Sequence, residues 1–263
     1  MSRSYLSTKR LAELEHTLSP RDWAIIATLS RLRLATGRQL YRLYFTGVTA
    51  RRAQQALASL AQRRLVARLA RTVGGVRAGS AGHVYTLDAA GCRLVVQGGR
   101  RQPRAWNVGL PFLAHTLAIT ELYVHLVEAD RTGQLELRDF TSEPACWRPF
   151  AGPGGGRVVL KPDAHLVIRL GDFEDQWFVE VDRGSEPTTT LARKCDTYRR
   201  YWQTGHEQTR TGVFPRVLFV VPDQHRYDTL TSVFGRQPAE AWHLFTVALA
   251  SEAVARIARG AQL

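Results

Sequence analysis

Apolar and polar positions recur with a helical period in the first part of the chain and with the period of a strand directly after it. Ser19 followed by Pro20 is typical of a helix start, and Thr49 is a favourable cap for a later helix. A basic, glycine-rich stretch over residues 74–82 separates the two alternating segments that follow. The pattern therefore predicts helices over residues 20–35, from residue 37 and over residues 50–64, and two strands over residues 65–72 and 83–87.

The third predicted helix has one apolar face and one polar face. Ala53, Leu57 and Leu60 share one side, whereas arginine and glutamine side chains occupy the other. Three helices followed by a hairpin is the order of a winged helix-turn-helix domain, in which the third helix enters the major groove and the hairpin loop follows the phosphates. We therefore expect duplex DNA to be contacted by Thr49, Arg51, Arg52, Gln54 and Gln55 on the helix and by Arg77 on the loop.

The distribution of charge agrees with a DNA-binding amino-terminal domain. The chain has 263 residues and a formal charge of +13. Residues 1–105 hold 19 of the 36 Lys and Arg but only 4 of the 23 Asp and Glu, so the remainder is near neutral. A basic module beside a near-neutral one is typical of a protein that docks on a polyanion with one part. Two alternatives stay open: a helical bundle whose arginines are merely solvated, and a winged helix that binds another protein.

The second half of the chain is predicted to form a mixed α/β domain. Residues 97–109 combine Gly, Pro and Arg without periodicity and are typical of a linker. We therefore expect a DNA-binding domain at 1–96, a linker at 97–110 and a second domain at 111–263. The elements predicted for the second domain are a largely apolar helix at 111–129, a strand at 134–141, a loop at 149–156, an antiparallel strand pair at 158–170 and 176–182, a helix from 188, a strand at 216–221, a helix from 224, a strand at 243–248 and a terminal helix from 251.

Neither a secretory signal nor a membrane span is predicted. The amino terminus is polar, and the longest uninterrupted apolar strings are far shorter than the ~20 residues that cross a bilayer. Three cysteines without a metal-binding spacing indicate a reducing compartment rather than a disulfide framework. We expect a soluble, cytoplasmic protein with no membrane partner.

The predicted strand pair carries the candidate chemistry. Side chains alternate across a strand, so Asp163 and His165 of the first strand share a face with acids of the second. These acids are Glu180 and Asp182, and a short turn brings them near Asp163 at one end of the pair. Like charges gathered in this way favour a bound cation, and hard carboxylate oxygens favour Mg²⁺ or Mn²⁺ over zinc.

Two further charged residues lie where they can join this site. Lys194 borders the apolar stripe of the helix that begins at residue 188, so its side chain can lean toward the sheet. Glu121 falls within the apolar stripe of the helix at 111–129. An acid in that position either caps a buried polar network or belongs to a site.

These residues carry a resemblance to a known superfamily. Pro162-Asp163, Glu180-Val181-Asp182 and the helical Lys194 resemble the PD-(D/E)XK phosphodiesterases, whose restriction-endonuclease-like fold is a central mixed sheet flanked by helices. More narrowly, PDAHLVI, EVDRGSEPTTTLARKCDTY and RVLFVVP after a winged helix resemble the replication-relaxation family of plasmids and other mobile elements, over most of residues 20–221. The superfamily pattern has lysine two residues after the acid of the third strand, where this chain has Asp182.

The resemblance implies a role for each candidate residue. Such enzymes hold Mg²⁺ on this strand pair and cut nucleic acid with an activated water. Lys194 would stabilise the negative charge that develops on the phosphate. The ion would be held by Asp163, Glu180 and the backbone carbonyl of Val181, and a second ion by Glu121 or Asp182.

Two hypotheses from different classes follow. In the first, the chain is a mobile-element enzyme that binds duplex DNA and nicks or cleaves it with Mg²⁺ or Mn²⁺ in plasmid replication or transfer. In the second, it is a non-catalytic replication or transcription regulator that uses a degenerate nuclease fold as a scaffold. Both are compatible with a homodimer and with contacts to other replication or transfer proteins. A third reading, with Tyr198 or Tyr201 as a nucleophile toward DNA, lacks the histidine cluster that such enzymes need.

Overall fold

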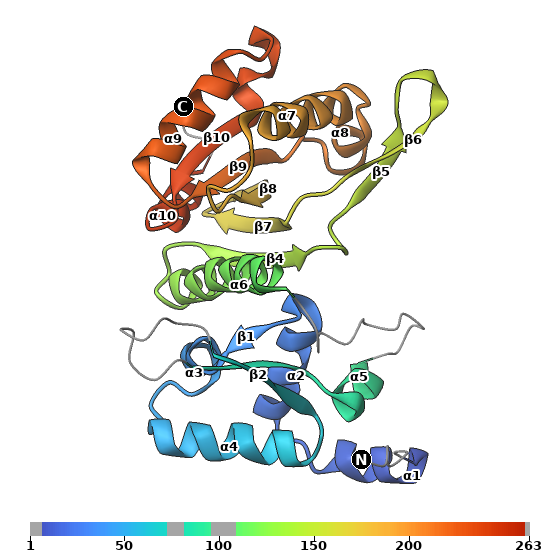
Figure 1. Cartoon of the computed structure of the whole chain (residues 1–263), viewed down its shortest axis with the longest axis vertical. Coiled ribbons are helices and arrows are strands. Elements are labelled where there is room, and N and C mark those ends of the chain that lie inside the picture. The colour runs from blue at the N-terminus through green and yellow to red at the C-terminus, as the bar shows by residue number, and fades with distance from the viewer. Residues whose placement is uncertain (1–6, 73–81, 96–108, 261–263) are drawn as a thin grey trace. The chain divides into compact units, whose positions relative to one another are not determined.

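The computed structural model describes residues 7–72, 82–95 and 109–260, and within these ranges the chain is a mixed α/β protein (Figure 1). It divides into two compact units, residues 1–124 and 125–263. The loop that carries Arg77 and residues 97–108 of the predicted linker lie outside the described residues.

The amino-terminal unit contains the three helices and two strands predicted from the sequence, together with short elements that the pattern does not indicate. Its strands β1 (Ala35–Thr36), β2 (Val66–Thr72) and β3 (His83–Leu87) form one antiparallel sheet in the order β1-β3-β2. Its helices are α1 (Thr8–His16), α2 (Pro20–Leu32), α3 (Gly37–Tyr44), α4 (Ala50–Gln62) and α5 (Ala89–Val95).

Side-chain caps determine where the predicted helices begin. Ser19 and Asp22 each accept a hydrogen bond from the other's backbone amide and form a capping box before α2. Thr36 and Gln39 form the same arrangement at α3, and the Thr49 hydroxyl caps α4. These side chains satisfy amides that have no partner within the helix, so the local sequence fixes each start.

The apolar faces of these helices pack into one core. Ala53, Leu57 and Leu60 of α4 are buried, as predicted, and they join buried residues of α2, α3 and the sheet. This packing fixes the rotation of α4 about its own axis and leaves its arginine and glutamine face exposed.

Helix α5 begins against the backbone that follows α4. The amide of Ala90 donates to the carbonyl of Arg64, and that of Asp88 donates to the carbonyl of Leu65, at 3.1 Å each. Gly91 lies on this first turn, and a Cβ atom there would be 2.1 Å from the Leu65 carbonyl oxygen. Glycine is therefore required for the two backbones to approach this closely.

The carboxy-terminal unit is built on a mixed five-stranded sheet flanked by helices (Figure 1). The order is β10-β9-β8-β7-β4, in which β8, β9 and β10 are parallel and β7 is antiparallel to both of its neighbours. The strands of this sheet are β4 (Glu136–Ser142), β7 (Ala164–Leu170), β8 (Phe173–Val181), β9 (Arg216–Val221) and β10 (Phe245–Leu249), and β5 (Arg148–Ala151) and β6 (Arg157–Leu160) form a separate hairpin. The α-helices are α6 (Leu110–Arg131), which begins in the amino-terminal unit, α7 (Thr188–Gln203), α8 (His206–Thr211), α9 (Gln224–Gly235) and α10 (Ala253–Ala258).

The β5–β6 hairpin corrects two predictions, the loop at 149–156 and the single strand at 158–170. Pro149 pairs with Val159, so only the tip of the predicted loop lacks strand structure. The long strand is broken at Pro162, which has no amide hydrogen for a ladder. The next amide, that of Asp163, donates to the carbonyl of Val179 at 3.0 Å and leads the chain into β7 of the main sheet.

Helix α6 is the one helix in the described ranges whose length and apolar composition would allow it to cross a bilayer. In the structure, 44% of its most apolar window is buried within the protein. Leu113 and Leu117 pack against Leu34, and the Thr120 hydroxyl donates to the Leu34 carbonyl at 2.7 Å. These contacts are those of a helix that packs in the core of the amino-terminal unit.

Replacing Gly91 with alanine is expected to lower the free energy of unfolding by about 2 kcal/mol or more, because the new methyl group must displace backbone atoms. Gly235→Ala is the matched control, since a Cβ atom at the end of α9 meets nothing within 4 Å. Urea unfolding followed by circular dichroism measures both changes. Equal stability of the two variants would contradict the close approach of α5 to Leu65.

Candidate functional site

Asp163 and Glu180 lie side by side at one end of the β7–β8 pair. Ala164 pairs with Val179 in the antiparallel ladder, so Asp163 faces Glu180. The Oδ2 atom of Asp163 accepts a hydrogen bond from the amide of Val181 at 2.6 Å. Asp163 is 7% exposed and Glu180 is 2% exposed. The two carboxylates are adjacent, as strand alternation predicts, and both are buried.

Helix α7 supplies a donor to each oxygen of Glu180. Lys194 Nζ donates to Oε2 at 2.9 Å and the Tyr198 hydroxyl donates to Oε1 at 2.7 Å, because residues four apart lie on the same helix face. Lys194 also donates to Glu186 Oε1 at 3.0 Å. Burial, followed by the charge of Asp163, raises the pKa of Glu180 to about 7. Burial alone would lower the pKa of Lys194, but Glu180 and Glu186 hold it above its ordinary value.

Asp182 is paired with a cation from another helix. Arg226 of α9 donates from Nε to Asp182 Oδ2 and from Nη2 to the backbone carbonyl of Glu186, the second at 2.7 Å. The amide of Gly184 donates to Asp182 Oδ1 at 2.7 Å. The chain therefore has a buried ion pair at the position where the PD-(D/E)XK pattern has lysine. Arg226 is 44 residues away in sequence, and no pattern in the sequence connects it with Asp182.

The polar network around Glu180 contains more carboxylates than cations. Its charged members are Asp163, Glu180, Asp182, Glu186, Lys194 and Arg226. Within the described residues, no group of three or more Asp, Glu, His or Cys side chains is arranged to hold a metal ion. An ion bound beside Asp163 and Glu180 would therefore need backbone or solvent oxygens to complete its coordination.

The structure places Glu121 in a different cluster, within the amino-terminal unit. Gln39 of α3 donates from Nε2 to Glu121 at 2.8 Å, and Arg42 of α3 forms an ion pair with the same carboxylate. Gln39 also donates to the carbonyl of Leu117 at 3.1 Å. Glu121 thus joins α6 to α3, which agrees with the polar-network alternative for this residue.

Four of the side chains predicted to contact DNA are exposed on α4, namely Arg51, Arg52, Gln54 and Gln55. None of the four forms an ion pair or a side-chain hydrogen bond within the ranges that the structure describes. Thr49 has a local role, since its hydroxyl accepts from the amide of Arg52 at 3.4 Å. The structure therefore leaves two cations and two amides of α4 available to a partner.

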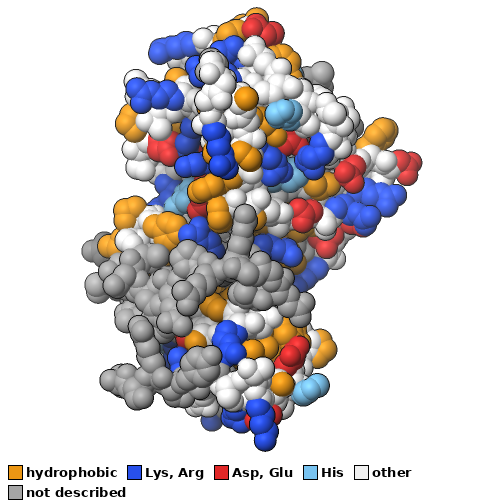
Figure 2. Space-filling view, turned by 90° about the vertical axis from the view of Figure 1, so that its right-hand side faces the viewer, with side chains coloured by type: hydrophobic (Ala, Val, Ile, Leu, Met, Phe, Trp, Pro, Cys, Tyr) orange, Lys and Arg blue, Asp and Glu red, His pale blue; other side chains and the backbone are white. Residues whose placement is uncertain are grey.

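The surface of the carboxy-terminal unit has a different charge pattern. Lys and Arg side chains are interspersed with Asp and Glu on the face seen in the upper part of Figure 2. Residues 125–263 contain 17 Lys and Arg against 18 Asp and Glu. An anion that binds this unit must therefore find a local group of cations rather than a general basic field.

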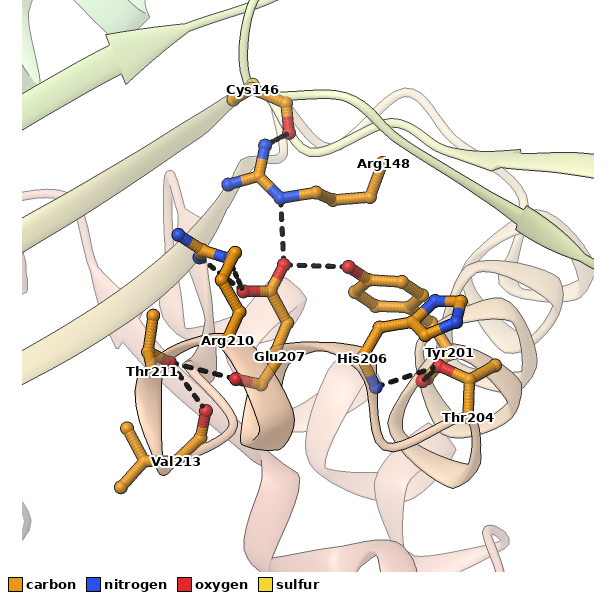
Figure 3. Close-up of polar contacts among 9 residues, drawn as sticks. All are labelled: Cys146, Arg148, Tyr201, Thr204, His206, Glu207, Arg210, Thr211 and Val213. Atoms are coloured by element: carbon orange, nitrogen blue, oxygen red, sulfur yellow. Dashed lines mark hydrogen bonds and ion pairs between the residues drawn. The ribbon is translucent and has the colours of Figure 1, made fainter.

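A second buried glutamate, Glu207 of α8, has no signal in the sequence pattern. Its side chain is 1% exposed and receives donors from three elements (Figure 3). Arg148 of β5 donates from Nε at 2.8 Å, Tyr201 of α7 donates from its hydroxyl at 2.7 Å, and Arg210 of α8 donates from Nε at 3.1 Å. Burial raises the pKa of Glu207, but the hydrogen bonds from Arg210, Tyr201 and Arg148 outweigh it and leave the pKa below its ordinary value.

Both tyrosines of α7 are bound to buried glutamates. Burial and the charge of Glu180 raise the pKa of Tyr198 well above its ordinary value, and burial and Glu207 raise that of Tyr201. Tyr198 is 0% exposed and Tyr201 is 4% exposed, so neither hydroxyl is open to a phosphate of DNA. The geometry therefore disfavours the tyrosine-nucleophile reading.

A family model described as replication-relaxation matches residues 26–217, a range that extends from within α2 into β9. It includes α4, the β7–β8 pair and α7, and so all the residues of the Glu180 network except Arg226. Comparison with curated proteins and with solved structures gives no match for the chain.

The raised pKa of Glu180 predicts a specific dependence of stability on pH. The folded chain binds a proton at Glu180 up to about pH 7, whereas the unfolded chain releases it near pH 4.5. Between these values the free energy of unfolding should fall as pH rises, by at most about 1.4 kcal/mol per pH unit from this group. The pKa of His165 is lowered to about 4, which makes the free energy of unfolding rise with pH up to about 6.5 and opposes this fall. The Glu180 contribution is therefore measured as a difference. In urea unfolding from pH 4.5 to 8, the stability of the wild type relative to Glu180→Gln should fall as pH rises.

Glu207→Gln is the control, because Glu207 is also buried but its pKa is lowered. At pH values well above its ordinary pKa, Glu207 is ionised in both the folded and the unfolded chain, so its replacement should keep the slope there. The assignment is wrong if Glu180→Gln and the wild type show the same pH dependence.

Proposed function

The chain belongs to the replication-relaxation family, and we propose that it binds duplex DNA through α4 of its amino-terminal unit during the replication or relaxation of that DNA. The observation that carries this proposal is the polar face of α4. Arg51, Arg52, Gln54 and Gln55 are exposed there and have no partner within the described residues. Arginine and glutamine pair with guanine and adenine, respectively, in the major groove.

Three features of the same unit support the proposal. Its element order, α2-β1-α3-α4-β2-β3, is that of a winged helix-turn-helix domain. The packing of Leu57 and Leu60 against the core holds α4 with its polar face outward. The strong basic excess of residues 1–105 would attract a polyanion and make binding sensitive to salt.

Replacing Arg51 or Gln55 with alanine should reduce discrimination between a preferred duplex and an unrelated one by about 1–3 kcal/mol, if each side chain reads a base edge. Fluorescence anisotropy with duplexes selected by the full-length protein measures this difference. Arg10→Ala is the matched control, because Arg10 is exposed on α1 and is paired with Glu13. The proposal fails if the α4 variants bind and discriminate as the wild type does.

A second candidate function, metal-dependent cleavage of DNA, is supported by the meeting of Lys194 and Glu180. Lys194 approaches from α7 and Asp163 directly precedes β7, so a cation and two carboxylates are brought together at one end of the sheet. The donor atoms are of a kind that suits Mg²⁺ or Mn²⁺, namely the carboxylates of Asp163 and Glu180 with the backbone carbonyl of Val181. The ion pair of Asp182 with Arg226 makes Asp182 the candidate that fits a metal least well.

Each residue of this site would have a separate task in cleavage. A bound divalent ion supplies an acidic water and neutralises charge on the phosphate. Lys194 would give up a contact with Glu180 or Glu186 and turn its ammonium toward the phosphate, where negative charge develops. Tyr198 would continue to donate to Glu180 and hold that carboxylate in place.

Supercoiled plasmid should be nicked or linearised by the wild type with Mn²⁺, and Asp163→Asn or Glu180→Gln should abolish this without loss of DNA binding. Lys194→Ala should slow cleavage by roughly 10²–10³-fold, the range for loss of one group that stabilises transition-state charge. Asp139→Asn is the control, because Asp139 is an exposed carboxylate on β4 of the same unit. Gel electrophoresis of the plasmid gives the rates.

The outcome separates the enzyme from a non-catalytic regulator. A wild type that binds DNA but leaves the plasmid intact with both Mg²⁺ and Mn²⁺ would contradict the nuclease. The proposal of DNA binding by α4 would be unaffected, and the Glu180 network would then be an internal support of the sheet.

A further inference from the structure

The Glu207 cluster has an excess of positive charge at a buried position. One ionised carboxylate is shared by two arginines, Arg148 on Oε1 and Arg210 on Oε2, while Tyr201 adds a neutral donor. Glu207 is buried, and its lowered pKa shows that it carries the negative charge. The hydrogen-bonded members of the cluster therefore carry two positive charges and one negative charge, while Asp139 and Asp163 act on the neighbouring His165 and Cys146.

Arg148 is held in one orientation by three different groups. Its Nε atom donates to Glu207 at 2.8 Å and its Nη1 atom donates to the carbonyl of Cys146 at 2.8 Å. Its guanidinium carbon lies 5.6 Å from the ring centroid of Phe178. A guanidinium fixed in this way loses little rotational freedom when it binds an anion.

Arg210 is the most exposed member of the cluster. Its side chain is 53% exposed, against 21% for Arg148. In Figure 3 the guanidinium group of Arg148 lies above the Glu207 carboxylate and that of Arg210 to its left, whereas Tyr201 approaches from the right. The two cations thus reach one carboxylate from different directions than Tyr201.

His165 is a buried polar residue beside the cluster. It is 6% exposed, and its Nε2 atom has no hydrogen-bond partner among the described residues. Its ring lies 5.3 Å from that of Phe178, the ring on which Arg148 stacks. Burial, with the charge of Arg148, lowers the pKa of His165 to about 4 and keeps it neutral. A buried nitrogen of this kind is normally satisfied by a water or by a ligand oxygen.

The ion pairs of Asp196 show by contrast what makes the Glu207 cluster unusual. Asp196 also meets two arginines, Arg199 and Arg200, but all three lie on α7 and the Asp196 side chain is 32% exposed. Such pairs along one helix are typical of a solvated surface. The Glu207 cluster instead joins β5, α7 and α8 around a buried carboxylate.

We propose that Arg148 and Arg210 form a clamp for a phosphate of the nucleic-acid backbone, with Glu207 as the residue that positions both. The clamp would be a second contact, on the carboxy-terminal unit, for the DNA that the amino-terminal unit binds, so it rests on the proposed function. Two planar guanidinium groups match the oxygens of a phosphodiester, and the excess of one positive charge among the hydrogen-bonded members matches its single negative charge.

The first test compares Arg210→Gln with Arg138→Gln in the full-length chain. Arg138 is 50% exposed on β4 of the same unit, so both variants lose one surface charge of similar exposure. Anisotropy titrations of a fluorescent duplex from 50 to 200 mM salt should show about tenfold weaker binding for Arg210→Gln. They should also show a salt slope smaller by about 0.9, because one phosphate contact is lost. Arg138→Gln should change neither quantity.

A second variant separates the clamp from a merely structural role. Glu207→Gln keeps one acceptor oxygen but places an amide NH2 group against the other arginine, so it should lower thermal stability and, by releasing that arginine, also weaken DNA binding. If Arg148 and Arg210 only support the fold, Arg210→Gln and Glu207→Gln will both lower stability and neither will change affinity. That result, or equal affinities for Arg210→Gln and Arg138→Gln, overturns the clamp.

Failure of the clamp can be distinguished from failure of the proposed function. If Arg51→Ala weakens DNA binding and Arg210→Gln does not, DNA binding by α4 stands and the clamp is wrong. If the wild type binds no duplex even at low salt, the proposed function is wrong. The arginine Nε–H resonances of the wild type are then titrated with inorganic phosphate, and shifts confined to Arg148 and Arg210 would support an anion site for a free phosphate, whereas no shift overturns it.

Discussion

The burial of Glu180 at the end of β8 is the constraint on which the carboxy-terminal unit depends. Removing a carboxylate from water costs several kcal/mol unless donors replace the solvent. Lys194 and Tyr198 supply those donors from successive turns of α7. Both must reach one carboxylate, so the rotation and position of α7 on the sheet are fixed together. Tyr201, three residues after Tyr198, then meets Glu207, which connects α7 to α8 and to the base of the β5–β6 hairpin.

The features that the sequence predicts well are those determined by short segments. Capping boxes at Ser19 and Thr36 mark their helices, because the cap and its partner are three residues apart. The adjacency of Asp163 and Glu180 follows from the alternation of two strands joined by a tight turn. In each case the interacting residues are connected by local backbone geometry.

The features that the sequence does not predict depend on contacts between distant segments. Arg226 reaches Asp182 from α9, and Arg148 reaches Glu207 across 59 residues. The sequence predicts a continuous strand through Pro162, because apolar residues continue on both sides of it, whereas the structure has a break there. Helix α5 is likewise stabilised by carbonyl groups that follow α4, together with the burial of Ala90 and Leu94 in the core of the amino-terminal unit. Tertiary partners thus decided these features, and no local pattern encodes them.

Two buried glutamates, Glu180 and Glu207, accept hydrogen bonds from α7, and the charges around them differ. Glu180 lies beside Asp163 and has one cation, Lys194, among the described residues. Burial, followed by the charge of Asp163, raises its pKa to about 7, so it binds a proton that an exposed glutamate would release. Glu207 has two cations among its hydrogen-bond partners, so it stays ionised. A phosphodiester bound together with a divalent ion would suit both groups. The ion would pair with the carboxylates of Asp163 and Glu180, and the phosphate would pair with Arg148 and Arg210. A non-catalytic regulator that binds DNA would use only the Glu207 cluster, and Glu180 would then bind a proton.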